Sequence, residues 1–520
     1  MKALVVFLIS LTLSTSCSVA FAANTDTSRP NVVIILADDM GWGDPQCYQP
    51  ESKIPTPNLD RLANEGMRFT DAHTPSSVCT PTRYTLLTGR YCWRTSLDKG
   101  VLDGFGPPLI KSDDATIATL LKQKGYRTAC VGKWHIGMDW FDRDGKPMGE
   151  RGPQRFRSGD NVDFERDITG GPCDVGFDSY FGISASLDMS PYAFIRDRRV
   201  ETMPTLWHDE IKGTIFLNGV SGVKSPGFDI HDVLPRLGDE AVSAIKQTSD
   251  DDRPLFLYMP LNSPHLPIAP SDESKGKSNA GDYGDFVWET DHVVGRVLNA
   301  LDEAGISDNT LVLFTSDNGG LWHWWDFNAD DDGGKIAMTP RGEYVKQFSH
   351  QSNASLRGTK ADIHEGGHRV PFIVRWPSRV TANQTSDALV ELTDMFATVA
   401  EITGQPIPSG TSGMDSFSFL SVLTGEKKSA RPFSVHHSLA GMFALRQGHW
   451  KMIEGRGSGG FTRPKFFDIK QGDPTGQLYD LADDPQEKRN QWLEQSGRVE
   501  AMTSLLDRVR ETSGREAATP

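Results

Sequence analysis

The sequence predicts an α/β protein: a large domain with a central, mostly parallel sheet covered by helices on both faces, and a smaller C-terminal α+β domain with an antiparallel sheet. Two observations carry this prediction. Short runs rich in β-branched residues alternate along most of the chain with helical patterns that end at glycine. These runs are mostly apolar and do not alternate with polar residues, which is typical of strands buried on both faces of a parallel sheet.

Five apolar runs are the predicted strands of the large sheet. The first of them stops at Asp38-Asp39, where polar residues end the run. The strands are predicted at residues 31–37, 127–131, 255–259, 311–315 and 372–374. Helical patterns lie between them at residues 57–65, 117–124 and 286–304. Each helical pattern is followed at once by glycine, which favours the left-handed backbone that ends a helix.

A second domain is predicted after the loop at residues 425–428, so that the large domain spans residues 29–428 and the smaller one residues 429–515. Within the smaller domain, strand patterns are predicted at residues 433–439, 442–453 and 465–469, and a helix at residues 484–510. Residues 511–520 are expected to be disordered, as polar chain ends commonly are.

Residues 1–22 are predicted to be a signal peptide that is removed from the mature protein. Lys2 precedes an apolar run at residues 3–13, and Ala20-Phe21-Ala22 supplies an A-x-A-type cleavage site. The run is shorter than a bilayer span, and no later segment is apolar over such a length. We therefore expect export to the periplasm or the extracellular space, and no membrane span in the mature chain.

The overall charge is acidic, since 54 Lys and Arg residues stand against 69 Asp and Glu residues, a formal net charge of −15. The sequence also contains no Lys/Arg-rich block. This balance excludes nucleic acid as the main partner, because the phosphate backbone requires an extended basic surface. An anionic ligand therefore requires a local basic pocket.

Carboxylate and amide side chains follow two of the predicted strands. Asp38 and Asp39 come after the first strand, and Asp317 and Asn318 after the strand at residues 311–315. Ligands of open α/β sheets bind outside the carboxyl ends of the strands, so neighbouring strands would bring these groups together. Four oxygen donors without His or Cys suit Ca²⁺ or Mg²⁺ better than zinc. Taken singly, each pair is equally typical of a turn or a helix N-cap.

The string Cys79-Thr80-Pro81-Thr82-Arg83 is predicted to begin a helix that ends at Gly89. Proline fits the first turn of a helix, and Cys79 and Arg83, four residues apart, share one face. A nucleophile at a helix N-terminus beside an Arg lies where backbone N–H groups favour an anion. Removal of the signal peptide leaves five cysteines, an odd number for an exported protein, so one needs a separate explanation. On this string alone, a capped helix with a buried free thiol stays open.

Basic residues follow two further predicted strands. Lys133 and His135 lie two residues apart after the strand at 127–131, so both would face one cleft if the backbone stays extended. His265 follows the strand at 255–259, and Lys360 lies in the loop before Glu365-Gly366-Gly367-His368-Arg369. Each residue taken singly is more often structural or solvated. Their joint occurrence in this order indicates a site.

Taken together, these motifs resemble those of the formylglycine-dependent (type I) sulfatases of the alkaline phosphatase superfamily, in particular the arylsulfatases. The resemblance runs from Asp38-Asp39 to Lys360 and on to the segment at residues 477–485, and so covers nearly all of the mature chain. It implies an alkaline-phosphatase-like fold. It also implies that a maturation system oxidises Cys79 to formylglycine (3-oxoalanine), which would explain the odd cysteine.

The same resemblance implies a bound ion and a nucleophile. Asp38, Asp39, Asp317 and Asn318 would hold Ca²⁺, with the modified residue 79 as a further ligand. The hydrated aldehyde at this position would attack sulfur in line while the alcohol leaves.

The resemblance also implies roles for the basic groups. Arg83 and Lys133 would steady the hydrated aldehyde, and Lys133, Lys360 and the metal would neutralise the sulfate oxygens. His265, helped by Lys360, would protonate the leaving oxygen, and His135 would take the proton whose loss expels sulfate. Ser186 would assist the Lys/His cluster, with Ser184 as the alternative position.

Two alternative functions stay open at this point. Phosphonate and phosphodiester hydrolases of the same superfamily share the Cys-x-Pro-x-Arg string but resemble Asp-His at the second metal pair, so Asp317-Asn318 favours sulfate esters. The other alternative is a non-catalytic protein that binds a sulfated glycan and keeps Cys79 as a thiol. The presence of every polar group that the mechanism needs argues against it.

An aromatic cluster follows the second metal pair and predicts the class of substrate. Aromatic faces stack on sugar rings, so we expect a carbohydrate subsite that includes Trp322, His323, Trp324 and Trp325. Packing of these rings within the loop at residues 321–352 is the alternative for any one of them. His368 and Arg369 are expected to meet a second anionic group. The predicted substrate is a sulfated polysaccharide or its oligosaccharides.

Overall fold

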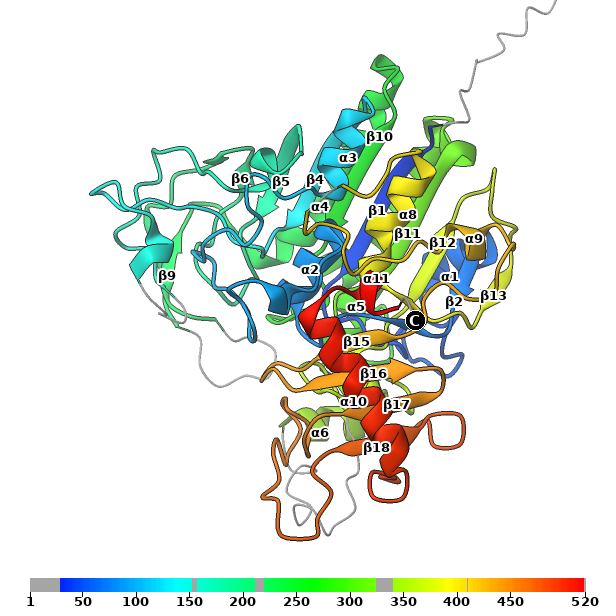
Figure 1. Ribbon diagram of the computed structural model, residues 1–520. Coiled ribbons are helices and arrows are strands. Elements are labelled where there is room, and N and C mark those ends of the chain that lie inside the picture. The colour runs from blue at the N-terminus through cyan, green and yellow to red at the C-terminus, as the bar shows by residue number, and fades with distance from the viewer. Residues whose placement is uncertain (1–28, 152–156, 211–218, 324–339, 409, 519–520) are drawn as a thin grey trace, which may run out of the picture.

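The computed structural model describes residues 29–151, 157–210, 219–323, 340–408 and 410–518 (Figure 1). The predicted signal peptide at residues 1–22 lies outside the described residues. Among the helices within these ranges, none is long and apolar enough to cross a membrane.

A ten-stranded sheet forms the centre of the large domain. In order across the sheet, the strands are β13 (Gln384–Ser386), β2 (Met67–Phe69), β12 (Phe372–Arg375), β11 (Thr310–Ser316), β1 (Asn31–Ala37), β10 (Leu255–Pro260), β4 (Arg127–Lys133), β5 (Ser179–Ile183), β6 (Ile195–Arg196) and β7 (Arg199–Val200). The strands from β11 to β5 are parallel, and antiparallel strands adjoin them on both sides. The parallel strands therefore all end at one edge of the sheet, which is where a ligand site is expected.

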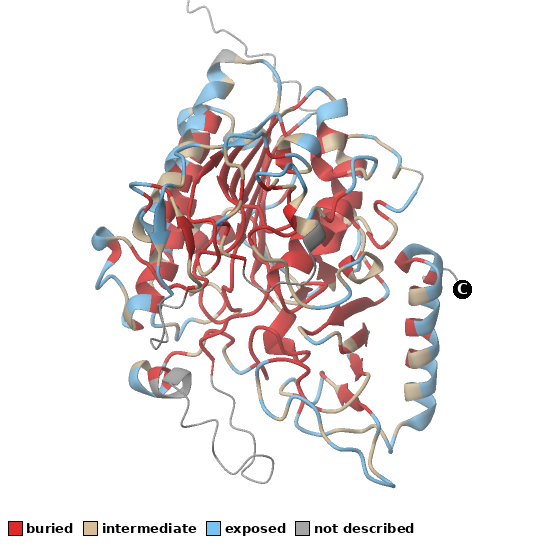
Figure 2. Ribbon diagram, turned by 90° about the vertical axis from the view of Figure 1, so that its left-hand side faces the viewer, coloured by how far each residue is buried: buried red, intermediate tan, exposed pale blue. Residues whose placement is uncertain are grey.

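Helices cover both faces of this sheet, which confirms the predicted fold class (Figure 2). One face packs against α1 (Pro57–Asn64), α4 (Val233–Lys246) and α5 (Gly281–Glu303). The other packs against α2 (Cys79–Thr88), α3 (Ile117–Gln123), α8 (Met395–Ile402) and α9 (Leu420–Leu423). Alternate residues of each strand enter the two cores; Val32 and Ile34 lie on the α2 face, whereas Val33 and Ile35 lie on the α5 face.

The smaller sheet is antiparallel throughout and lies beyond one end of the large sheet (Figure 1). Its strands are β15 (Ser434–His437), β16 (Phe443–Gln447), β17 (Trp450–Ile453) and β18 (Gln477–Asp480). Helix α10 (Ser496–Glu511) packs across β16 and β17 and buries Met502 and Leu506 against them. The remaining elements are β3 (Ala72–His73), β8 (Leu206–His208), β9 (Gly222–Lys224), α6 (Pro340–Phe348), α7 (Glu365–His368), β14 (Val390–Glu391) and α11 (Gly514–Ala517).

All five predicted strands of the large sheet occur, as β1, β4, β10, β11 and β12, whereas its other five strands were not predicted. The prediction is less accurate in the smaller domain. The predicted strand at 442–453 is two strands, because Gly448, with φ of 57°, makes the turn between β16 and β17. Residues 465–469 form no strand, and β18 was not predicted. The last long helix begins at Ser496 rather than Asp484, because Asp484 closes a turn by donating its N–H to the Asp480 carbonyl.

The chain end is also more ordered than expected. Residues 514–517 form α11, capped by the Ser513 hydroxyl, which accepts from the Glu516 N–H. The Gly514 N–H donates to Asp415 Oδ1 at 2.7 Å, which ties this helix to the large domain. Local polarity predicted disorder here, but a contact some hundred residues distant along the chain decides the outcome.

A buried ion-pair network joins the large domain to the segment that leads into β15. Arg431 donates to Glu391 Oε2 at 2.6 Å, to Asp394 Oδ1 at 3.1 Å and to the Tyr91 hydroxyl at 3.0 Å. All of these side chains are fully buried, and burial raises the pKa of Glu391 to about 7 even beside the guanidinium. Loss of the cation would leave buried carboxylates without their partner.

We expect Arg431→Leu to lower the free energy of unfolding by about 3–5 kcal/mol, because breaking one side of a buried ion pair leaves an uncompensated charge. Denaturant unfolding of the full chain measures this. Arg489→Leu is the control, because the Arg489–Glu494 pair is exposed and should contribute at most about 1 kcal/mol. Equal losses for the two variants would contradict the prediction.

Candidate active site

The carboxyl ends of β1, β4, β10 and β11 and the N-terminus of α2 converge on one buried cluster of polar side chains. The cluster consists of Asp38, Asp39, Cys79, Arg83, Lys133, His135, His265, Asp317, Asn318 and Lys360, each less than a tenth exposed. These residues come from six separate parts of the sequence. They are the predicted metal, nucleophile and acid–base residues, and the parallel sheet brings them together as expected.

The acidic half of the cluster comes from the ends of β1 and β11, which are neighbours in the sheet. The Asp39 N–H donates to Asp317 Oδ1 at 3.2 Å, and Asn318 Nδ2 donates to Asp39 Oδ1 at 2.7 Å. Asp38 Oδ1 and Asn318 Oδ1 are buried and have no hydrogen-bond partner within the described part of the chain. Unpaired buried oxygens of this kind fit a hard cation, and a donor set of oxygens alone fits Ca²⁺ or Mg²⁺.

The carboxyl groups interact strongly with one another. Burial and the charge of Asp38 raise the pKa of Asp317 to about 7. Burial alone would also raise the pKa of Asp38, but the charges of Lys133, His265 and Arg83 outweigh it and hold that pKa well below its usual value. The ionised form of carboxyl groups this close together is stabilised by positive charge, which Lys133 and Arg83 supply in part.

The basic half of the cluster surrounds these carboxylates. Arg83 Nε donates to Asp317 Oδ2 at 2.9 Å, and its Nη1 donates to the Lys133 carbonyl at 2.9 Å. Lys133 Nζ donates to Asp38 Oδ2 at 2.6 Å, and Lys360 Nζ lies 2.8 Å from Asp39 Oδ1. Arg83, Lys133 and Lys360 therefore pair with Asp317, Asp38 and Asp39, so the predicted basic groups gather at one place inside an acidic protein.

Helix α2 places residue 79 in the midst of these charges. The helix begins at Cys79 after the extended residue Val78, and it ends at Gly89, whose φ of 63° is left-handed. This confirms the predicted helix. The Cys79 side chain is 2% exposed, and burial raises the pKa of its thiol although Lys133 and Lys360 lower it. All five described cysteines are free thiols, so none of them is engaged in a disulfide.

His135 is oriented by a backbone group that the sequence could not reveal. Its Nε2 lies 2.8 Å from the Leu102 carbonyl, so Nε2 carries the hydrogen and donates it. Its Nδ1 is buried and without a partner among the described residues. Burial and the Lys133 charge hold the pKa of His135 well below its usual value. His135 therefore presents an unprotonated Nδ1 that can accept a proton.

In His265 the Nδ1 atom, rather than Nε2 as in His135, faces a backbone carbonyl. Its Nδ1 faces the Leu266 carbonyl and so carries a hydrogen, and its Nε2 lies 3.8 Å from Asp39 Oδ2. Its Nε2 therefore faces the acidic half of the cluster. His265 is 8% exposed, more than the other residues of the cluster.

The structure separates the two candidate serines. Lys133 Nζ donates to the Ser186 hydroxyl at 2.6 Å, whereas Ser184 contributes its carbonyl, which accepts from the His135 N–H at 2.9 Å. Ser186 is therefore the serine whose side chain joins the lysine.

The two described members of the aromatic cluster, Trp322 and His323, are packed inside the protein. Trp322 is 1% exposed, and its ring lies against Tyr283 and Tyr344. His323 Nε2 lies 2.8 Å from the Leu356 carbonyl, and burial lowers its pKa to about 4. Burial of this kind leaves neither ring open to a sugar. The other two aromatic residues of the prediction, Trp324 and Trp325, lie outside the described residues.

His368 and Arg369 are also in positions that differ from the prediction of contact with a second anionic group. His368 is fully buried, stacked on His436 at 4.0 Å, and hydrogen-bonded to His73 Nδ1 and Lys451 Nζ. The Arg369 guanidinium donates to the Thr70 carbonyl, and it is surrounded by the carboxylates of Asp71 and Glu365. Position in a Gly-rich loop suggested a ligand contact, but His368 joins the two domains instead, and Arg369 pairs with groups of the large domain.

The buried histidines make stability depend on pH. Burial lowers the pKa of His73, and burial together with neighbouring cations holds those of His368 and His436 well below the usual value. Burial also lowers the pKa of His437 to about 4. Below a pH of about 6.5 the unfolded chain binds protons at these positions and the folded chain does not. The free energy of unfolding therefore falls as the pH falls.

We expect denaturant midpoints to drop steeply between pH 7 and pH 5, with His437 alone contributing about 3 kcal/mol of the loss by pH 4. In His437→Gln the slope of stability against pH should decrease by about one proton. In the surface variant Arg489→Gln it should stay as in the unchanged chain. A pH-independent midpoint would contradict the prediction.

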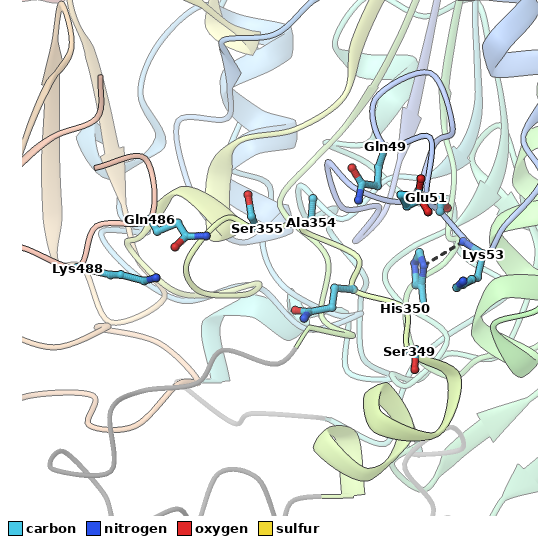
Figure 3. Close-up of a pocket in the computed structure, with 11 residues that line it drawn as sticks. Gln49, Glu51, Lys53, Ser349, His350, Ala354, Ser355, Gln486 and Lys488 are labelled. Atoms are coloured by element: carbon cyan, nitrogen blue, oxygen red, sulfur yellow. Dashed lines mark hydrogen bonds between the residues drawn. The ribbon is translucent and has the colours of Figure 1, made fainter. Parts of the chain in front are cut away.

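A polar cavity of about 620 Å³ lies elsewhere on the surface (Figure 3). It is lined by residues 49–53, 349–355 and 486–488, among them Gln49, Lys53 and Gln486. His350 connects this cavity to the interior, since its Nε2 lies 2.8 Å from Asp44 Oδ1. None of the residues of the buried cluster lines it, so the chemistry of the protein is assigned to the cluster.

Comparison with known proteins agrees with this geometry. The Sulfatase family model matches residues 30–405, and the family model of the N-sulphoglucosamine sulphohydrolase C-terminal region matches residues 359–514. N-acetylgalactosamine-6-O-sulfatase of Bacteroides thetaiotaomicron is 31% identical over 93% of this chain and 94% of its own length. Human arylsulfatase A is 30% identical over 91% of this chain and 86% of its own length.

Solved structures show the same relationship. A Bacteroides thetaiotaomicron structure, from work on a genetic locus for the metabolism of multiple glycosaminoglycans, has a TM-score of 0.77 at 30% identity and covers 93% of this chain and 100% of its own. PsFucS1 sulfatase from Pseudoalteromonas sp. has a TM-score of 0.70 at 25% identity, over 94% of this chain and 91% of its own. The match of family, fold and buried cluster shows that this chain belongs to the sulfatase family, whose members are sulfuric ester hydrolases.

Proposed function

We propose that the protein is an exported sulfatase that hydrolyses sulfate esters of a carbohydrate, with Cys79 converted to formylglycine as the nucleophile and Ca²⁺ as the bound ion. One observation carries the proposal: residue 79 begins a helix inside a buried cluster with two lysines and two oxygens, Asp38 Oδ1 and Asn318 Oδ1, that have no partner among the described residues. The predicted signal peptide supports export. Periplasmic or extracellular fractions of the native host should contain the protein beginning after residue 22.

The charge balance of the cluster favours a sulfate ester. The carboxylates of Asp38, Asp39 and Asp317 pair with Arg83, Lys133 and Lys360. Since three negative charges offset three positive ones, a divalent cation would give the site a net positive charge. A sulfate monoester carries one negative charge and would be attracted to it.

The chain's own residues supply the remaining chemistry. When bound, the cation would hold the sulfate oxygens and residue 79 and withdraw electron density from sulfur. Lys133 and Lys360 would offset the charge that develops on these oxygens. His265, protonated at Nε2, would donate to the leaving alcohol oxygen, because loss of an alkoxide is otherwise unfavourable. His135 would accept a proton at Nδ1, the nitrogen that the Leu102 carbonyl leaves free.

The relatives support a sulfated carbohydrate as substrate. One is an N-acetylgalactosamine-6-O-sulfatase, and another is N-acetylgalactosamine-6-sulfatase of the dog, 31% identical over 78% of this chain. Both act on the 6-sulfate of an amino sugar by their names. We therefore propose 6-sulfated N-acetylgalactosamine, alone or in an oligosaccharide, as the first substrate to test.

A panel of sulfated mono-, di- and oligosaccharides, assayed for released sulfate with Ca²⁺ present, tests this function. A phosphonate monoester serves as the control for the alternative activity within the superfamily. Release of sulfate from 6-sulfated N-acetylgalactosamine at a rate well above phosphonate hydrolysis is expected. A preference for the phosphonate monoester would overturn the assignment to sulfate esters.

A further inference from the structure

Asn262 is a buried amide whose hydrogen-bonding capacity is unused. The residue is 2% exposed, and neither Oδ1 nor Nδ2 has a partner among the described residues. An unpaired buried amide costs free energy, so such groups are uncommon in folded proteins and are concentrated at functional sites. The mechanism given above does not use Asn262.

The backbone around Asn262 is held by the catalytic cluster. Arg83 Nη2 donates to the Leu261 carbonyl at 3.3 Å, and the Asp38 N–H donates to the Ser263 carbonyl at 2.9 Å. The residue lies just beyond β10, and β10 runs between β1 and β4. Asp38 extends β1 and Lys133 ends β4, and their ion pair of 2.6 Å spans the end of β10. Asn262 is therefore located between Asp38 and Lys133.

The alternation of side chains indicates the direction of the amide. Leu261 packs in the core on the α5 face, and the Ser263 hydroxyl lies 2.7 Å from the Thr290 hydroxyl of α5. Asn262, between them, is thus directed to the opposite face, that of α2. The same face holds the Arg83 guanidinium, which lies 3.6 Å from Asp38 Oδ2. Residue 79 begins α2, so the amide and the nucleophile share one face of the sheet.

We infer that Asn262 is a substrate-binding residue whose Nδ2–H donates a hydrogen bond to an oxygen of the sulfate group. An ionised sulfate ester offers only acceptors, and an amide nitrogen supplies a donor without adding charge to a site that already balances three cations with three carboxylates. This inference rests on the proposed function. It assigns a hydrogen-bond donor in addition to Lys133 and Lys360.

Asn262→Ala tests the inference, with Asn353→Ala as the matched control. Asn353 is equally buried, but its amide is fully used: Oδ1 accepts from the Gly320 N–H, and Nδ2 donates to the Gly320 and Gly358 carbonyls. We expect Asn262→Ala to lower kcat/KM about 100-fold and to raise the inhibition constant of inorganic sulfate about tenfold or more. Its Tm should equal or exceed that of the unchanged protein, whereas Asn353→Ala should lose about 4 °C or more.

Asn262→Asp is the second variant, because it preserves shape and replaces the donor by a negative charge. It should weaken sulfate inhibition at least as much as Asn262→Ala does. A kcat/KM within about threefold of the unchanged protein for both variants would overturn the inference. So would a loss of Tm in Asn262→Ala equal to that in Asn353→Ala with sulfate inhibition unchanged, which would assign the amide to a structural water.

The rise in Tm that inorganic sulfate causes is measured in parallel, because it requires no turnover. If the unchanged protein releases no sulfate from any ester, the proposed function fails. The inference about Asn262 is then still decided by whether sulfate stabilises the unchanged protein and fails to stabilise Asn262→Ala. Equal stabilisation of the two by sulfate would overturn it.

Discussion

Cys79→Ala is expected to abolish sulfate release, with a loss of about 10⁴-fold or more in kcat, because it removes the proposed nucleophile at the N-terminus of α2. Released sulfate, measured with the best substrate of the panel, gives the rate. The folded structure should persist, since alanine fits the first turn of a helix and the Cys79 thiol is not part of a disulfide.

The matched control is Cys92→Ala. Cys92 is also a buried free thiol, and burial raises its pKa to about 12, but it lies outside the cluster. Its removal should leave kcat within about threefold. Peptide mass spectrometry of active protein should further show residue 79 as an aldehyde or its hydrate. Full activity in protein that carries an unmodified thiol at residue 79 would contradict the proposed nucleophile.

Removal of the bound cation is the second change with a large expected effect. Chelation should reduce activity to background, and Ca²⁺ should restore it, because Asp38 Oδ1 and Asn318 Oδ1 are buried and have no partner in the described part of the chain. Return of Ca²⁺ should also raise Tm, since a ligand that binds only the folded state stabilises it. Activity and thermal unfolding are measured on the same chelated and reloaded samples.

Asp38→Asn should weaken Ca²⁺ binding by about 100-fold, because it removes the negative charge of one proposed Ca²⁺ ligand. It also leaves Lys133 and Arg83 without the carboxylate that they face. Asp291→Asn is its control. Asp291 is also a buried carboxylate, but it accepts from the N–H groups of Asn58 and Leu59 at the start of α1 and should leave Ca²⁺ binding unchanged. Activity that survives exhaustive chelation would refute the metal assignment.

The sequence predicts five adjacent strands of the central sheet, from β12 to β4, because they are local features. In the first run, residues 32–37 are apolar and those at 32–35 are β-branched, so burial on both faces was expected and occurs. Helix α2 was likewise predictable, since Pro81 and Gly89 specify its first turn and its end. Once the parallel sheet is assumed, Asp38, Asp39, Asp317 and Asn318 must meet at its carboxyl edge.

The smaller domain was predicted less well because its boundaries depend on contacts between distant segments. Residues 465–469 have strand-forming side chains, but β18 at 477–480 is the strand that pairs with β17. The choice between the two is made by hydrogen bonds to another strand, which local propensity does not encode. Helix α11 is ordered by Asp415 in the same way.

For the site itself, the sequence alone determined which chemical groups are present, because residue type and strand-end position follow directly from the order of residues. Only the tertiary structure decided which of them face one another. His368 and Trp322 are of residue types that often contact ligands, yet packing buries both side chains. Leu102 and Asn262 belong to no predicted site, yet the Leu102 carbonyl orients His135. Asn262, just beyond the strand between those that lead to Asp38 and Lys133, has an amide without a partner among the described residues. Orientation and pairing depend on groups that are far apart along the chain, and folding alone brings those groups into contact.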